Sequence, residues 1–284
     1  MARVGPAQHE VIAEHLGPTP LRTATDKETA MTDRRIIGID CAVDPCHVGV
    51  ANGVLSGDQL SLIDVKLCSC SCLPAATAAA YAQGHGDVLF ALDAPLGWSR
   101  HLGPELFRHS AGQPMEVSAD RLFRRETDGF VRENVGKQPL DVGADRIART
   151  ARDALDVLQA IGTQLGEQVE LAWDESARGR KAIEVYPAAT LKAHGVRASG
   201  YKKPEDSEGR REIAAALEER MTIKGGGQLL LKNSHALDAA VCVLAGADFF
   251  RGQSLRPKDP LTSRKEGWIW VRNPQLESAR KPLD

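Results

Sequence analysis

The chain has 284 residues and a formal net charge of −2, with 42% hydrophobic and 26% charged residues. Its length suits one elaborated domain or two small ones. The near-neutral charge argues against a protein that coats polyanions without specificity. No apolar run approaches the roughly 18 residues that a membrane span requires, so we expect a soluble, cytoplasmic protein that does not contact membranes.

The ends of the chain differ in character from its centre. The first 33 residues contain three prolines and lack the apolar core of a secretory signal. We expect a disordered extension over residues 1–33, with Met31 as an alternative natural start. A main domain over 34–272 and a C-terminal tail over 273–284 complete the predicted organisation.

Strand patterns dominate the beginning of the main domain. Runs of alternating or β-branched residues predict a meander of strands over residues 34–42, 47–55 and 59–71. The alanine-rich segment 73–84 has a proline in its first turn and a glycine at its end, which predicts a helix. An apolar strand over 87–92 follows, and it ends at Asp93.

Helices and strands alternate in the second half. Residues 98–138 are polar with little periodicity, and we expect a helical insertion there, after the fourth strand. The remaining predicted elements are a helix over about 139–166, a strand over 181–186, helices over 208–221 and 234–250, and a closing strand over 267–271. Hairpins followed by helix-linked strands indicate an α/β fold with a mixed sheet flanked by helices.

The cysteine-rich stretch "CSCSC" could suggest a metal clip. It contains Cys68, Cys70 and Cys72, whose alternation is typical of a strand with all three thiols on one face. Structural zinc sites favour wider spacing and a second ligand pair elsewhere, so we favour ordinary thiols over zinc.

Acidic residues end or follow several predicted elements. Asp40 and Asp93 end two strands that helical crossovers should make parallel neighbours, and Glu184 enters the same end from the next strand. The helix over 234–250 offers Asp238, with His235 three residues earlier on the same face. Because ligands bind outside the carboxyl ends of such strands, we expect one site there.

Crowded carboxylates raise one another's pKa values unless a cation neutralises them. Hard oxygen ligands suit Mg²⁺ or Mn²⁺, and two such ions about 4 Å apart are an established device for cutting phosphodiesters. Structural alternatives exist for each residue. Asp40 could cap the following turn, Asp93 could form an Asx-turn, and His235 could simply be the partner of a buried Asp238.

Several motifs together resemble a known family. The segments "IIGIDCA", "ALDAPLG", "IEVYPAA", "YKK", "HALDAAVCVLAG" and "EGWIWV" occur in this order between about residues 35 and 272. They are similar to the domain-of-unknown-function 429 family, described as predicted ribonuclease H-like nucleases. The resemblance implies a ribonuclease H-like fold with a mixed five-stranded sheet in the order 3-2-1-4-5. The "HALDAA" stretch is also similar to the final motif of Holliday-junction resolvases.

The resemblance also implies roles for individual residues. It assigns metal ligation to Asp40, Asp93 and Asp238, with His235 as a substitute ligand because this chain has Asn233 and Ser234 where family members often carry an aspartate. In "RRETD", Arg125 and Asp128 match a region that could contact a substrate phosphate, although the two could also pair on a helix surface. Tyr201 and Lys202 match the family's "YK", and Lys202 could supply a positive charge to a reacting oxygen.

Three functions are compatible with these patterns. The first is a nuclease that hydrolyses the phosphodiester bonds of nucleic acid, DNA or RNA, by a two-metal-ion mechanism. The second is an ATP-dependent phosphotransferase of the actin-like or sugar kinase type, for which "KGGGQ" at 224–228 would be a phosphate loop. The third is a non-catalytic ribonuclease H-like binding module, which the substitutions at 233–235 favour. The sequence also leaves open a homodimer.

Overall fold

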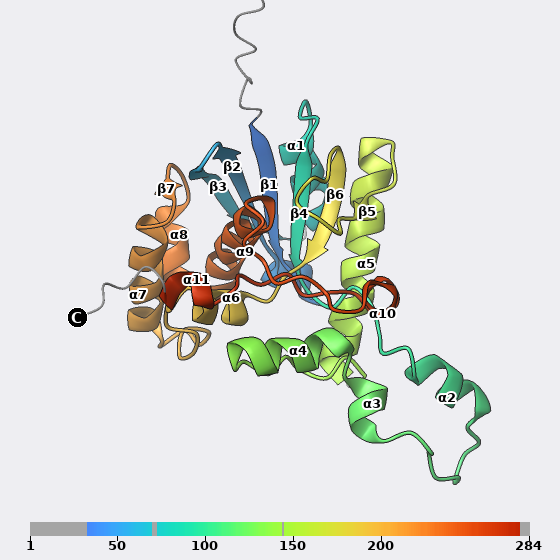
Figure 1. Cartoon of the computed structure of the whole chain (residues 1–284). Helices are drawn as coiled ribbons and strands as arrows, with labels where there is room; N and C mark the ends of the chain where they lie inside the picture. The colour runs from blue at the N-terminus through green and yellow to red at the C-terminus, as the bar shows by residue number, and fades with distance from the viewer. Residues whose placement is uncertain (1–32, 70–72, 144, 279–284) are drawn as a thin grey trace, which may run out of the picture. The chain divides into compact units, whose positions relative to one another are not determined.

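The computed structural model describes residues 33–69, 73–143 and 145–278 (Figure 1). Seven strands of this part form one mixed sheet in the order β5-β6-β4-β1-β2-β3-β7. Their bounds are β1 Arg34–Asp40, β2 Gly49–Ser56, β3 Gln59–Leu67, β4 Val88–Asp93, β5 Glu170–Leu171, β6 Arg180–Glu184 and β7 Thr222–Ile223.

The pairing of the strands is mixed, as the sequence predicts. The strands β1, β2 and β3 form an antiparallel meander, whereas β4 pairs with β1 in parallel and β6 pairs with β4 in parallel. The expected number of five strands is wrong, because the two-residue strands β5 and β7 add parallel pairs at the two edges of the sheet.

Helices cover both faces of the sheet. The longest apolar helix, α9, packs on one face together with α6, α7 and α8, whereas α1 and α5 pack on the other face. The helix bounds are α1 Pro74–Ala82, α2 Leu102–Arg108, α3 Ala119–Phe123, α4 Glu126–Val135, α5 Asp145–Leu165, α6 Pro187–Ala193, α7 Ser207–Glu218, α8 Gly227–Lys232, α9 Ser234–Phe250, α10 Pro260–Glu266 and α11 Gln275–Ser278, and a 3₁₀ turn, η1, spans Pro45–His47.

Two glycines set the position of α9 on the sheet. A Cβ atom on Gly38 would lie 2.1 Å from the carbonyl oxygen of Ala239, and one on Gly49 would lie 2.3 Å from that of His235. Side chains at these points would therefore push the helix away. Because Gly38 and Gly49 have no side chains, the first turns of α9 can pack directly against the end of β1.

The predicted insertion over 98–138 contains α2, α3 and α4. Figure 1 shows α2 and α3 away from the sheet, whereas α4 lies beyond the carboxyl ends of the central strands. The helix α4 packs against α6 and α10.

The predicted closing strand over 267–271 is wrong. This segment makes one parallel bridge, between Ile269 and Glu184, and is otherwise irregular. Its apolar side chains, including Trp268 and Trp270, are buried nonetheless. A strongly apolar pattern here reflects packing at the end of β6 rather than an extended ladder.

Some predictions fall outside the described residues. These include the extension up to residue 32 and the thiols of Cys70 and Cys72, whereas Cys68 is buried. Among the helices of the described part, none has the length and apolar character needed to cross a membrane.

Candidate functional site

Three aspartates from distant parts of the chain converge beside the carboxyl end of the sheet. Asp40 and Asp93 end β1 and β4 and are partners in the parallel register, and Asp238 lies in the second turn of α9. One carboxylate oxygen from each lies within 4.8 Å of the others. We call these three residues the aspartate cluster.

Alternation along the strands explains why two of these carboxylates meet α9. In β1, Ile36 packs on the α9 side and Ile39 packs on the opposite side, so Asp40 projects towards α9. The same alternation places Leu92 on the opposite side and Asp93 on the α9 side. The helix supplies Asp238 to the same space.

The aspartate cluster is electrostatically crowded. Burial raises the pKa of Asp40 well above its usual range, and the charge of Asp238 raises it further. Burial and the charge of Asp40 likewise raise the pKa of Asp93. The two side chains act on each other electrostatically, so ionisation of one makes ionisation of the other less favourable. A bound cation would offset this repulsion.

Two residues from the loop before α7 engage the third carboxylate. The Tyr201 hydroxyl donates a hydrogen bond of 2.9 Å to Asp238 Oδ1, and the Lys202 ammonium pairs with Asp238 Oδ2. Burial alone would lower the pKa of Lys202, but Asp238, Asp93 and Asp40 raise it overall, so this side chain is charged. Burial and Asp238 raise the pKa of Tyr201, which keeps its proton. Asp238 itself is fully buried.

An imidazole contacts the aspartate cluster from α9. His235 Nδ1 lies 2.6 Å from Asp40 Oδ2, and the ring stacks on His47 of η1 with 5.4 Å between centroids. Burial lowers the pKa of His235. Asn233 caps α9, because its side-chain oxygen accepts a hydrogen bond of 2.8 Å from the His235 amide. The asparagine at this position therefore has a structural role at the helix start.

Glu184 lies at the same end of the sheet but on the other face. It is the partner of Leu92 in the parallel register of β4 and β6, and paired residues point to the same side. Leu92 packs on the α1 and α5 side, away from α9. The structure therefore does not bring Glu184 into the aspartate cluster.

Glu184 belongs instead to a buried ion-pair network with Arg125 and Asp128. Arg125 Nη2 lies 2.7 Å from Glu184 Oε1 and 2.9 Å from Asp128 Oδ1, and Arg125 Nη1 lies 2.8 Å from Glu184 Oε2. All three side chains are at most 3% exposed. Arg125 and Asp128 do pair, but in the interior rather than on a helix surface. This network joins α4 to the end of β6.

A cavity of about 550 Å³ opens beside the aspartate cluster. Its polar wall includes Asp40, Asp93, Lys202 and His235, and Arg125 and Glu184 also reach its lining. Three lining residues to which sequence reasoning gave no role are Cys41, Lys137 and Tyr186. Tyr186 lies in the motif "IEVYPAA", which could have drawn attention to it. Lys137 follows no recognisable pattern.

The glycine-rich stretch "KGGGQ" lies elsewhere. It joins β7 to α8, and none of its residues lines the cavity. A Cβ atom on Gly225 would lie 2.4 Å from the carbonyl oxygen of Ile63 in β3. Close packing against β3 therefore accounts for glycine at this position.

The fold and the site define a mixed α/β protein with an aspartate cluster beside the carboxyl end of its sheet. A family model described as "Protein of unknown function (DUF429)" matches residues 38–262, and the chain belongs to this family. Neither the curated proteins nor the solved structures contain a match to the chain.

Proposed function

We propose that this protein is a metal-dependent nuclease that hydrolyses phosphodiester bonds of nucleic acid. The observation that carries the proposal is the convergence of Asp40, Asp93 and Asp238 within 4.8 Å beside an open cavity. Carboxylates so close together are costly unless positive charge joins them. Lys202 supplies one such charge, and three carboxylates leave an excess of negative charge beyond it.

The donor set of the aspartate cluster fits Mg²⁺ or Mn²⁺. Asp40, Asp93 and Asp238 offer hard oxygen ligands from two strands and a helix, which rigid elements hold in place. His235 orients Asp40 through its Nδ1 contact, as outer partners of metal ligands commonly do. Divalent ions bound here would activate a water molecule and stabilise the departing oxygen of an in-line displacement.

The chain's own residues would position the reacting phosphate. Lys202 is charged and partly exposed at the cavity, so its ammonium can approach a phosphate oxygen while it remains close to Asp238. Tyr201 holds Asp238 in one orientation through its hydrogen bond. Arg125 is fully committed to its two carboxylate partners, so we assign it to support of the site rather than to substrate contact.

The strand order supports the same class of enzyme. Within the seven-stranded sheet, the run β3-β2-β1-β4-β6 matches the order 3-2-1-4-5 expected of a ribonuclease H-like fold. Fold alone does not establish an activity, so the argument depends on the aspartate cluster.

Cleavage of end-labelled single-stranded, duplex and branched oligonucleotides with Mn²⁺ or Mg²⁺ tests the proposal. We expect cleavage by the wild-type chain and a loss of at least about 100-fold in Asp40→Asn and Asp93→Asn, on the scale of other electrostatic contributions to catalysis. Asp58→Asn removes an exposed carboxylate outside the site and should retain full activity. Equal activity in Asp40→Asn and the wild type would refute the proposal.

A non-catalytic binding module is the second candidate. It is favoured by the ion pair of Lys202 with Asp238 and the contact of His235 with Asp40, which already engage two of the three carboxylates. The module predicts nucleic-acid binding without Mn²⁺ binding, whereas the nuclease requires both. Isothermal titration with Mn²⁺ separates the two candidates.

A further inference from the structure

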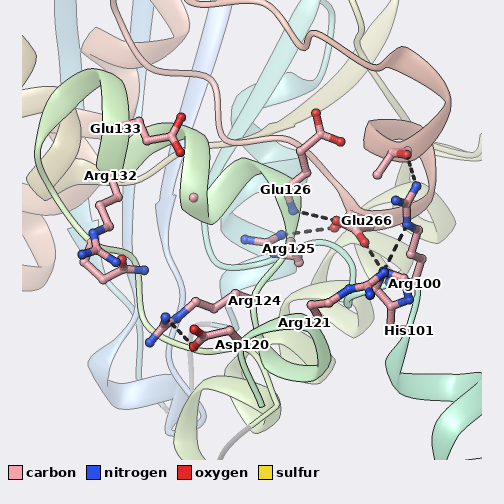
Figure 2. A pocket seen from close by; sticks show the side chains of 13 residues that line it. Arg100, His101, Asp120, Arg121, Arg124, Arg125, Glu126, Arg132, Glu133 and Glu266 are labelled. Atoms are coloured by element: carbon pink, nitrogen blue, oxygen red, sulfur yellow. Dashed lines mark hydrogen bonds and ion pairs between the residues drawn. The ribbon is translucent and has the colours of Figure 1, made fainter. Parts of the chain in front are cut away.

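A second cavity, of about 740 Å³, lies on the insertion (Figure 2). Its walls come from the start of α2, from α3, from α4 and from α10. It adjoins the first cavity, because Arg125 lines both and Gln138 lines the second between Lys137 and Pro139 of the first. We call it the arginine pocket.

Two guanidinium groups converge on one imidazole nitrogen in the arginine pocket. Arg121 Nη2 lies 3.2 Å from His101 Nε2, and Arg100 Nε lies 3.5 Å from the same atom. One imidazole nitrogen has a single lone pair, so it can accept a hydrogen bond from only one of the two arginines at a time. Two like charges therefore meet at one imidazole nitrogen.

Three of the arginines that line the pocket differ from the others in having no ion-pair partner. Within the described residues, no ion pair is formed by Arg100, Arg121 or Arg132. Arg124 differs, because Asp120 lies 2.6 Å from its Nη1. Arg121 and Arg132 are thus available to a ligand, whereas Arg100 also donates a hydrogen bond to the Thr262 hydroxyl and lies near Asp259 and Glu126.

The acids of the arginine pocket are occupied or turned away. The buried carboxylate of Glu266 accepts hydrogen bonds of 2.9 and 2.7 Å from the backbone amides of Arg100 and Glu126. Figure 2 shows the side chain of Glu133 across the pocket from Arg121. Glu126 is close enough to Arg100 for the two charges to act on each other. Among the described residues, neither glutamate forms an ion pair with Arg100 or Arg121.

We infer that the arginine pocket binds a phosphate group of the nucleic-acid strand, at a nucleotide next to the one that reaches the aspartate cluster. Paired guanidinium groups with free N–H donors match the oxygens of a phosphodiester, which they can bind in a bidentate manner. The shared wall between the two cavities lets one strand occupy both. This inference depends on the proposed function for its choice of ligand.

Equilibrium binding in the absence of metal tests the inference separately from catalysis. Fluorescence anisotropy would follow a labelled single-stranded oligonucleotide binding to the full chain in EDTA. We expect Arg121→Ala and Arg100→Ala each to weaken binding about ten-fold, the scale of one charge-assisted hydrogen bond. The slope of log affinity against log salt concentration should become shallower by about 0.7 for each phosphate that a variant no longer neutralises.

Matched variants make the result specific. Arg211→Ala removes an exposed arginine from α7, outside the arginine pocket, and should bind like the wild type. Arg121→Lys keeps the charge but loses the paired N–H donors of the guanidinium. Its affinity for the oligonucleotide should therefore lie between those of Arg121→Ala and the wild type. Should Arg121→Ala fail to fold by circular dichroism, Arg132→Ala on the opposite wall provides the same test.

Each possible binding result either supports or overturns the inference. Weaker binding in the pocket variants alone supports the inference even if no cleavage is ever detected. Wild-type affinity in Arg121→Ala and Arg132→Ala overturns it. Binding of inorganic phosphate that depends on Arg121, without any binding of the oligonucleotide, would also overturn the assignment to a nucleic-acid strand.

Discussion

Replacement of Arg125 by methionine is the most demanding test of how the site is supported. The side chain is 1% exposed, and its partners Asp128 and Glu184 are 0% and 3% exposed. Methionine would keep much of the volume but leave two buried carboxylates without a counter-ion. Breaking one buried pair typically costs about 3–5 kcal/mol, so we expect a loss of free energy of unfolding at or above that range at pH 7.5.

The stability of Arg125→Met should depend on pH in a definite direction. Burial already raises the pKa of Glu184 above its usual value although Arg125 opposes the shift, and without Arg125 the pKa should rise further. A carboxyl group whose pKa is higher in the folded than in the unfolded state contributes stability at low pH. This contribution is lost as the pH rises through the pKa of the folded state. Arg125→Met should therefore recover stability between pH 7.5 and about pH 5.

Urea denaturation followed by circular dichroism at several pH values measures both effects. The triple variant Arg125→Met, Asp128→Asn, Glu184→Gln also removes the two unpaired carboxylates. Its free energy of unfolding should be partly restored at pH 7.5, and acidification should not be needed for this gain. A decrease below about 1 kcal/mol for Arg125→Met, or a stability that does not increase on acidification, would refute the reasoning about this network.

Other predictions follow from the aspartate cluster and its scaffold. Gly38→Ala should destabilise the chain by about 1–3 kcal/mol or more in urea denaturation, because the new methyl group meets the backbone of α9; wild-type stability would contradict this close packing. Lys202→Met should tighten Mn²⁺ binding in calorimetry while it lowers cleavage, since it removes a cation that competes for Asp238; weaker binding would show that Lys202 does not compete. Mn²⁺ affinity should fall as the pH decreases, because the raised pKa values of Asp40 and Asp93 let protons compete with the metal. Binding should also release protons, which calorimetry in buffers of different ionisation enthalpy measures; a flat pH profile would contradict the raised pKa values of the two carboxyl groups.

Local sequence patterns predicted much of the fold. The helix predicted over 234–250 is observed as Ser234–Phe250, because a largely apolar run with an asparagine cap before it leaves little choice of start or end. The parallel pairing of β1 and β4 followed from the handedness of helical crossovers, and it places Asp40 opposite Asp93.

The face of the sheet on which Glu184 lies could not be predicted from its position at the end of a strand. Alternation of side chains, together with the register between β4 and β6, places it on the face opposite Asp93. Register depends on tertiary packing and could not be read from the strand alone.

The partners of Arg125 show a second limit. Its local partner, Asp128, is three residues away and was predictable from helical spacing, whereas Glu184 is 59 residues away. Burial of the pair by α4, α10 and the segment after it depends on packing between distant parts of the chain. The arginine pocket was hidden for the same reason, since its residues come from separate helices of a polar insertion.

A crystal structure determined with Mn²⁺, with the metal located by anomalous scattering, tests the central claim most directly. Our account predicts manganese bound by the carboxylates of Asp40, Asp93 and Asp238. An absence of manganese at these carboxylates at millimolar concentration, with Lys202 still the counter-ion of Asp238, would contradict it.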